Sequence, residues 1–453
     1  MRSYLFLGMC ALFLVNYFLS IRWMESVVVA FVFAAFFGSV TKADAVPRWF
    51  GISMLGIGLY LEIDKGGGAA GIQEGILMNL PLLTLVILVP LLAVPLKLGG
   101  NFDAIEGFLQ RFKHQPRKLF LGITSVLFLL GPILNLGSIR IVDELIKGLK
   151  LPPPMLAKSY AVGFSTTMFW SPYYASVALV LYYVKIPAVE YMAYGIGLGL
   201  LFLLIGNLLF AAGAGRHSSE PGGAGQNASA ELALSTEHRR KLYQLGFIIT
   251  CLMSVTLLLE AFTEWSMLAI VSLLAIAFPL VWGIVTNGWT RIKPHLIDFR
   301  DRSVPLMNNE IVLFTSAGFL GHAMQGTSFG NGIKWFLLSL SHQSFLLFAV
   351  VVVAVIAVVT FVGVHPMVVV TALLSQMNAQ ELGTDNHVLA MLLILAWSVS
   401  AVISPVNPMN LLISRLSGLS GLQTGLRYNG LHVLCVAVLG LFLITMFHYS
   451  MQG

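Results

Sequence analysis

Long apolar runs recur along this chain from end to end, and they constrain its fold more than any other feature. One helix needs roughly 20 apolar residues to cross a bilayer core of about 30 Å, and a soluble domain has no use for so many such runs. Only 10% of the 453 residues are charged, against about 25% in soluble domains. No segment shows the strict alternation of a membrane β-strand. The sequence therefore predicts an all-α polytopic membrane protein.

The apolar runs predict about eleven transmembrane helices, arranged as one extra helix and two sets of five. Simple spans are expected at residues 3–20, 24–40, 47–63, 75–97, 188–212, 241–260, 264–288, 309–328 and 428–449. Residues 213–240 are rich in Gly, Ser and charge, which predicts a flexible cytoplasmic linker. We therefore expect a first helix plus first repeat over 1–212 and a second repeat over 241–453.

Two longer regions, 118–184 and 344–418, have a more complex pattern that they share. In each, an apolar segment reaches a Gly/Pro turn, GPILNLGS in the first region and VGVHP in the second, and a second helical segment follows. This pattern is typical of a re-entrant hairpin, which is tolerated at membrane depth only where protein or a wet cavity surrounds it. We expect one such hairpin in each repeat.

About 40 residues after each turn, a Ser-Pro step interrupts an apolar run. GFSTTMFWSPYYASV and AWSVSAVISPVNPMN match at Ser165/Ser398, Ser171/Ser404 and Pro172/Pro405. Proline breaks a helix and is favoured at the first position of a new one, so each Ser-Pro predicts the cap and first residue of a half-helix. A single Ser-Pro step is more often a simple kink. Two at corresponding positions favour a binding site, because free N–H groups at half-helix starts suit an anion and unwound carbonyls suit Na⁺.

The basic residues predict the orientation of the chain. With the N-terminus in the cytoplasm and the C-terminus outside the cell, most Lys and Arg side chains fall in cytoplasmic loops, as the positive-inside rule requires. This placement also explains the net charge of +6 without a nucleic-acid partner. An odd number of spans in each repeat makes the two repeats inverted. We expect a multi-pass protein of the plasma membrane.

This arrangement resembles the ion transporter superfamily, which includes the divalent anion–sodium symporters, arsenite and citrate permeases and the membrane subunits of TRAP transporters. The resemblance covers nearly the whole chain as architecture. The divalent-anion symporters carry Ser-Asn-Thr at their hairpin tips, whereas the tips here read Asn135-Leu-Gly-Ser138 and Gly363-Val-His365-Pro366. Only Asn135 corresponds to part of that motif, so the resemblance implies a transporter without fixing a dicarboxylate as its substrate.

Polar residues at the tips and breaks are the candidate ligands. The predicted substrate-binding residues are Asn135, Ser138, Thr166, Thr167, Ser171, His365, Ser400, Ser404, Asn407 and Asn410. The candidate Na⁺ ligands are Asn135, Ser165, Ser398 and Asn407. Two roles stay open for Asn135, a ligand or the cap of the hairpin's second arm, and for His365, a ligand or a hydrogen-bonded packing residue.

Charged residues near these segments give weaker signals. Arg140, Asp143 and Glu144 lie one helical turn apart, which favours a structural ion pair of Arg140 with either acid over a substrate or proton site. Glu310 starts a span, and a role in proton coupling is the less favoured of its two interpretations. The three cysteines have no paired spacing and are expected to be packing residues.

The leading hypothesis is a secondary active transporter of a small organic anion, coupled to Na⁺ or H⁺ and working by alternating access. The alternatives are a sodium–proton antiporter, and a membrane lipid-handling protein without ion coupling. No enzyme motif is found, and no cofactor is expected apart from Na⁺ as a coupling ion. The expected partners are the small-molecule anion, the lipid bilayer and, as an open alternative, a second copy of the chain in a homodimer.

Overall fold

The computed structural model describes residues 2–214 and 236–451, which fold into helices and turns with no strand among them. The first half contains α1 (Arg2–Leu19), α2 (Arg22–Val40), α3 (Ala45–Asp64), α4 (Gly68–Leu77), α5 (Leu80–Leu88), α6 (Ala93–Leu98), α7 (Asn101–Gln110), α8 (Pro116–Leu134), α9 (Gly137–Ile146), α10 (Pro153–Thr167), α11 (Ala175–Val184) and α12 (Ala188–Ala214). The second half contains α13 (Thr236–Phe262), α14 (Met267–Val285), α15 (Trp289–Asp298), α16 (Asn308–Met324), α17 (Ser328–Gln343), α18 (Phe345–Phe361), α19 (Pro366–Leu374), α20 (Asn386–Ile403), α21 (Pro408–Ser417) and α22 (Gly430–Ser450).

Nine helical runs within the described residues are long and apolar enough to cross a membrane. They are α1, α2, the run from α4 to α6, α8, α12, α13, α14, the run from α20 to α21, and α22. The chain is thus an all-α, multi-pass membrane protein, as the sequence predicts. Two further expected spans, α3 and α16, are present as helices of 20 and 17 residues.

Both complex regions fold into the expected elements. A helix pair joined by a tight tip is formed by α8 and α9 in the first half and by α18 and α19 in the second. A helix with an interruption follows in each half, as α10 and α11 and as α20 and α21. We call the two helix pairs hairpin 1 and hairpin 2, and the two interruptions break 1 (residues 168–174) and break 2 (residues 404–407).

The predicted caps of the half-helices are wrong by three residues. Tyr174 precedes α11 and Asn407 precedes α21, whereas Ser171 and Ser404 lie inside the breaks. In the second half, the cap-plus-proline pattern does occur, but at Asn407-Pro408, where the Asn407 side chain accepts a hydrogen bond from the N–H of Met409. Asn and Ser are about equally favoured as caps, so the cap residue alone does not choose between Ser404-Pro405 and Asn407-Pro408.

The two halves pack their helices in the same pairs. Helix α8 contacts α10 and α12, and α10 contacts α12, while α18 contacts α20 and α22, and α20 contacts α22. Between the halves, α10 packs on α21 and α11 packs on α20, so the two broken helices cross. Helix α20 lies at the centre of the molecule. In the apolar stretch of the α20–α21 run 89% of the residues are buried, against 28% in the corresponding stretches of α13 and α22.

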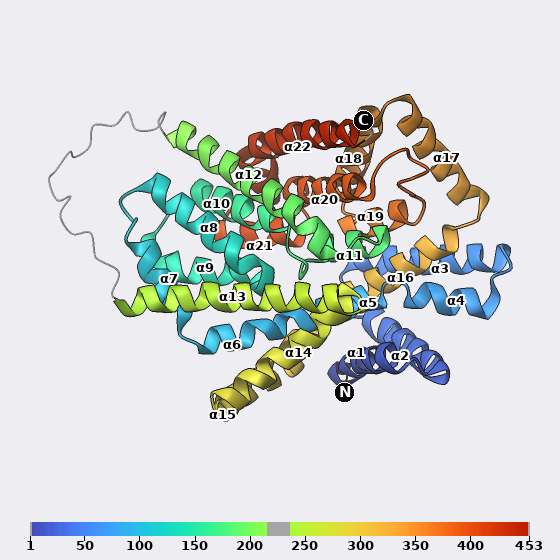
Figure 1. The fold of residues 1–453 in the computed structure, drawn as a ribbon, viewed down its shortest axis with the longest axis horizontal. Helices are drawn as coiled ribbons and strands as arrows, with labels where there is room; N and C mark the ends of the chain where they lie inside the picture. The colour runs from blue at the N-terminus through green and yellow to red at the C-terminus, as the bar shows by residue number, and fades with distance from the viewer. Residues whose placement is uncertain (1, 215–235, 452–453) are drawn as a thin grey trace.

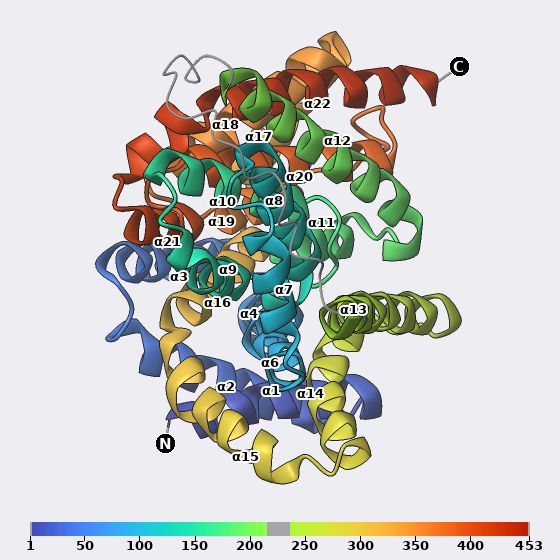
Figure 2. The same ribbon diagram turned by 90° about the vertical axis from the view of Figure 1, so that its left-hand side faces the viewer.

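The other helices lie beside this group of hairpins and broken helices. In Figure 2, α12, α18 and α22 lie at the top, α1, α2, α14 and α15 at the bottom, and α3 and α16 between them. The α3–α16 contact is unusually close, because a Cβ atom on Gly51 would lie 2.1 Å from Val312 and one on Gly58 would lie 2.8 Å from Phe319. Small residues of this kind let membrane helices approach each other. The α3–α16 pair thereby forms one wall next to the hairpins.

Three helices between the spans were not anticipated from the sequence. They are α7, α15 and α17, of 10, 10 and 16 residues. Figure 1 shows α6, α7, α15 and the start of α13 at one end of the molecule and α17 at the other. Most of the predicted linker, residues 215–235, lies outside the described residues, and its two margins extend α12 and α13.

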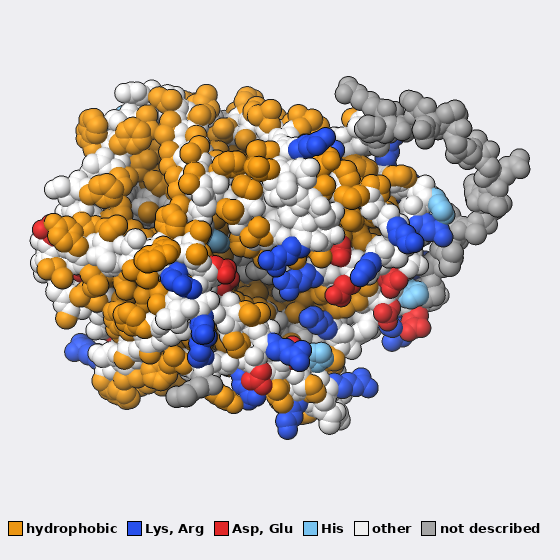
Figure 3. Space-filling model, turned by 180° about the vertical axis from the view of Figure 1, so that it is seen from behind, with side chains coloured by type: hydrophobic (Ala, Val, Ile, Leu, Met, Phe, Trp, Pro, Cys, Tyr) orange, Lys and Arg blue, Asp and Glu red, His pale blue; other side chains and the backbone are white. Residues whose placement is uncertain are grey.

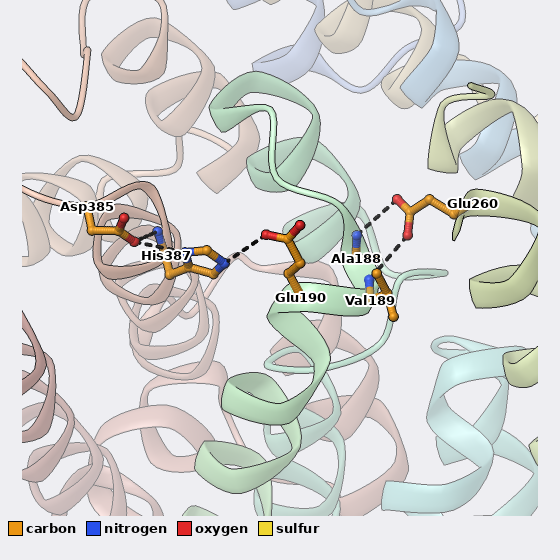
Figure 4. A network of polar contacts seen from close by, with 6 residues as sticks. All are labelled: Ala188, Val189, Glu190, Glu260, Asp385 and His387. Atoms are coloured by element: carbon orange, nitrogen blue, oxygen red, sulfur yellow. Dashed lines mark hydrogen bonds and ion pairs between the residues drawn. The ribbon is translucent and has the colours of Figure 1, made fainter. Parts of the chain in front are cut away.

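A polar network joins helix ends from both halves (Figure 4). Glu260, near the end of α13, accepts hydrogen bonds of 2.9 and 3.2 Å from the first two backbone N–H groups of α12. The neighbouring Glu190 lies 3.4 Å from Nε2 of His387, whose Nδ1 lies 2.8 Å from the carboxylate of Asp385, the cap of α20. The network therefore ties α12 to both α13 and α20.

Candidate functional site

A cavity of about 540 Å³ lies where hairpin 2, break 2 and the α3–α16 pair meet. Its wall includes residues 362–366 at the hairpin 2 tip, residues 404, 406 and 407 of break 2, the start of α21 at Pro408, and the first residues of α3 and α16. Hairpin 1 contributes Leu136 and Arg140. The cavity is thus bordered by both hairpins, and we call it the central cavity.

Two capped helix starts border the central cavity. His365 caps α19 by accepting a hydrogen bond of 3.2 Å at Nδ1 from the N–H of Met367. Asn407 caps α21 by accepting one of 3.0 Å at Oδ1. Each cap satisfies one of the free N–H groups in the first turn and leaves others unpaired within the helix. Both side chains are therefore partly used by the fold, and both helix starts present positive partial charge near the cavity.

Ser404 and Asn410 stabilise break 2. The Ser404 hydroxyl, which borders the cavity, donates a hydrogen bond of 2.8 Å to the carbonyl oxygen of Thr360 in α18. The Asn410 amide donates to the carbonyl oxygens of Val402 and Ser404, while its own Oδ1 has no hydrogen-bond partner. These donors satisfy carbonyls that lose their helical partners at the break, which is essential at membrane depth.

The corresponding residues of the first half do not border the central cavity. Thr166 and Thr167 are buried and donate to carbonyls of their own helix at 3.0 and 3.2 Å. Ser171 is fully buried, and its hydroxyl has no hydrogen-bond partner. Ser400, in the second half, likewise donates to its own helix, to the carbonyl of Trp397 at 2.8 Å. The structure therefore does not bring all the predicted ligands into one cavity.

Ser165 and Ser398, which correspond in the sequence match, lie in contact. The Ser398 hydroxyl donates to the backbone oxygen of Ser165 at 3.2 Å, where the two broken helices cross. With Thr166 they border a small void beside His432, separate from the central cavity. Of the four candidate Na⁺ ligands, this pair is close together, whereas Asn407 borders the central cavity.

The tip of hairpin 1 has an unusual backbone conformation at Asn135. Its φ of 50° and ψ of −139° are disfavoured for any residue other than glycine. Its Oδ1 accepts a hydrogen bond of 2.7 Å from the N–H of Leu136, and its backbone oxygen accepts one from the hydroxyl of Ser138. Strained residues of this kind are frequent at binding sites. The side chain stabilises the tip, and the next residue borders the cavity.

Arg140 is not paired as predicted. Among the described residues, it forms no ion pair with Asp143 or Glu144, and Asp143 instead accepts a hydrogen bond of 2.7 Å from the hydroxyl of Tyr160. Arg140 lies one turn after the hairpin tip and borders the central cavity. Arg415, at the end of α21, borders it as well. The sequence analysis favoured the ion pair over a substrate site for Arg140, and it did not single out Arg415 as a candidate ligand.

Acidic side chains border the same cavity from the α3–α16 pair. Asp44 accepts a hydrogen bond of 2.7 Å from the side-chain amide of Asn309. One carboxylate oxygen of Glu310 is buried and has no hydrogen-bond partner. No three His, Cys, Asp or Glu side chains in the described part of the chain are grouped to hold a metal. The site can thus form charge-assisted hydrogen bonds with a ligand but is not built as a transition-metal centre.

No known protein family and no curated protein matches this sequence. In structure, the chain is similar to the YdaH transporter of Alcanivorax borkumensis, which is described as having an unusual topology. The TM-score is 0.56, and the similarity covers 89% of this chain and 97% of the other at 14% sequence identity. The chain thus has a fold found in a membrane transporter, and at this identity the likeness concerns the fold alone.

Proposed function

We propose that the protein is a secondary active transporter that carries a small organic anion across the plasma membrane, coupled to Na⁺ or H⁺, by alternating access. The central cavity is the observation that carries the proposal. Arg140 and Arg415 border it together with the starts of α19 and α21. Both arginine side chains are exposed, so an anion in the cavity can reach them, and an exposed ion pair contributes about 0–1 kcal/mol. The N–H groups at the two helix starts can supply further stabilisation of a bound anion.

The proposal includes membership of the ion transporter superfamily. Each half contains one hairpin and one broken helix, and the broken helices of the two halves cross. Discontinuous helices at corresponding positions of two repeats are the best sequence indication of a transporter's binding site.

The distribution of basic residues supports the proposed orientation. In Figure 3, Lys and Arg side chains gather in one half of the visible face and are sparse in the other. The basic half is the end where α6, α7 and the start of α13 lie in Figure 1. By the positive-inside rule this end faces the cytoplasm, so that α17 lies on the outer side.

A sodium–proton antiporter is the second candidate, because Glu310 borders the central cavity and one of its carboxylate oxygens is buried without a hydrogen-bond partner. Reconstitution into liposomes with an imposed Na⁺ or H⁺ gradient tests both proposals, with labelled di- and tricarboxylates, sulfonates and oxyanions. We expect one class of anion to accumulate under one gradient. Exchange of Na⁺ for H⁺ without anion uptake would favour the antiporter, and the absence of both fluxes would contradict both candidates.

A further inference from the structure

Opposite charges occupy different walls of the central cavity. Arg140 is on α9 of hairpin 1, and Arg415 is on α21. Asp44 and Glu310 belong to the α3–α16 pair, whose first residues are joined by the hydrogen bonds between Asp44 and Asn309. The basic groups therefore come from α9 and α21, and the acidic groups come from the starts of a different pair of helices, α3 and α16.

These charges are not neutralised by one another. Among the described residues, neither arginine forms an ion pair with Asp44 or Glu310. Asp44 already accepts a hydrogen bond from Asn309, whereas one oxygen of Glu310 is buried without any partner. Arg140, Arg415 and Asp44 are exposed, so water can solvate their charges. By contrast, leaving the buried oxygen of Glu310 without a partner is unfavourable. A ligand that carries only negative charge would form ion pairs with the arginines but would leave Glu310 without a partner.

Apolar side chains also border the cavity. They include Phe50, Leu313, Phe314, Val364, Leu411 and Leu412. The cavity volume of about 540 Å³ falls within the roughly 300–1,000 Å³ of ordinary small-molecule sites. The cavity therefore has the volume and the apolar surface to accommodate the organic body of a small ligand.

We propose that the substrate is amphoteric: an organic molecule with an oxyanion at one end and an ammonium or similar cationic group at the other. Arg140 and Arg415 bind the oxyanion, Glu310 binds the cationic end, and the apolar wall contacts the part between them. This inference rests on the proposed transport function, since it specifies the substrate class of the same cavity. It distinguishes an amino acid or a related conjugate from a simple carboxylate of the same length.

Matched probes test the inference in liposomes that contain the purified full chain. The probes are labelled ω-amino acids of four to eight carbons, together with the monocarboxylates and dicarboxylates of the same lengths. We expect at least one amino acid to have a half-saturating concentration about tenfold or more below that of both partners. A site built to bind a polar group discriminates strongly against an analogue without it. Equal affinities across each matched set would overturn the inference.

Two variants assign the roles. Glu310→Gln should abolish the preference for the amino acid over the matched carboxylate, and Arg140→Gln should weaken both probes about tenfold or more. Glu74→Gln, at an exposed glutamate outside the cavity, is the matched control. If Glu310→Gln removed only the response to an H⁺ gradient and kept the preference, the carboxylate would carry the coupling proton, and the inference would be wrong.

The outcomes separate this inference from the proposed function. Gradient-driven uptake of plain carboxylates, with no advantage for the amino acids, would retain the anion transporter and exclude the amphoteric substrate. Failure to accumulate any probe under either gradient would contradict both.

Discussion

At the scale of single residues, hydroxyl and amide groups in break 2 serve the fold as well as the cavity. Ser404 borders the cavity and also hydrogen-bonds the Thr360 carbonyl. Asn407 borders it and also caps α21. A variant at either position therefore alters stability and binding together, and the two effects have to be separated by choosing the replacement.

At Asn407, two replacements can separate the effect on stability from the effect on binding. Asn407→Ala removes the cap, which costs about 0.5–2 kcal/mol, and should raise the half-saturating substrate concentration roughly 5- to 150-fold, because a lost polar partner costs about 1–3 kcal/mol. Asn407→Ser keeps a capping oxygen on a shorter side chain. We expect the serine variant to recover the melting temperature but not the affinity. Recovery of both would show that Asn407 acts only as a cap.

Some residue-scale predictions followed from the sequence and others could not. The match of Ser165 with Ser398 identified two residues that lie in contact across the halves. The prediction of an ion pair between Arg140 and Asp143 was wrong. Helical spacing permits this pair, but in the structure the Asp143 carboxylate accepts a hydrogen bond from the hydroxyl of Tyr160 in α10 instead. The choice between these partners depends on a neighbouring helix, which spacing along one helix does not specify.

At the scale of helices, the apolar runs predicted helices at the expected spans, and the Gly/Pro turns and Ser-Pro steps predicted the helix pairs and the interrupted helices. In break 2, the helix start was misplaced because two Pro residues follow Ser404 within four positions, each after a residue that can cap a helix, and α21 begins at the second, after Asn407. The short helices α7, α15 and α17 lack a long apolar run, so a search for runs does not detect them.

The stability that the Asp385 cap of α20 contributes should depend on pH. Partial burial raises the pKa of Asp385, but hydrogen bonds from the backbone and ring of His387 lower it more, so the pKa lies below its usual 3.8. A lowered pKa adds stability that is present above the usual value and is lost as pH falls through the folded-state value. Asp385→Asn keeps the cap and removes the charge.

For this half-exposed side chain we expect a difference of about 0.2–1 kcal/mol between wild type and Asp385→Asn. Melting temperatures in detergent should differ at pH 5 and converge below pH 3.8, the usual value. A constant difference across this interval would exclude the carboxylate as its cause.

The α3–α16 contact gives a second prediction at this scale. Gly51→Ala would place Cβ 2.1 Å from Cγ1 of Val312, and overpacking of this kind costs about 1–3 kcal/mol. Val312→Ala removes the obstructing methyl groups. We expect the double variant to melt at a higher temperature than Gly51→Ala alone. Additive losses would indicate that the helices separate to accommodate the methyl group and that this wall of the cavity is not rigid.

At the scale of the whole molecule, the two ends differ in charge, and this difference determines which end faces the cytoplasm. Lys113, between α7 and α8, lies at the basic end, whereas Gln343 ends α17 at the opposite end, and both are exposed. In a chain whose three cysteines are replaced, we expect an impermeant maleimide to label Gln343→Cys on intact cells. Lys113→Cys should react only after permeabilisation. The reverse pattern would invert the topology.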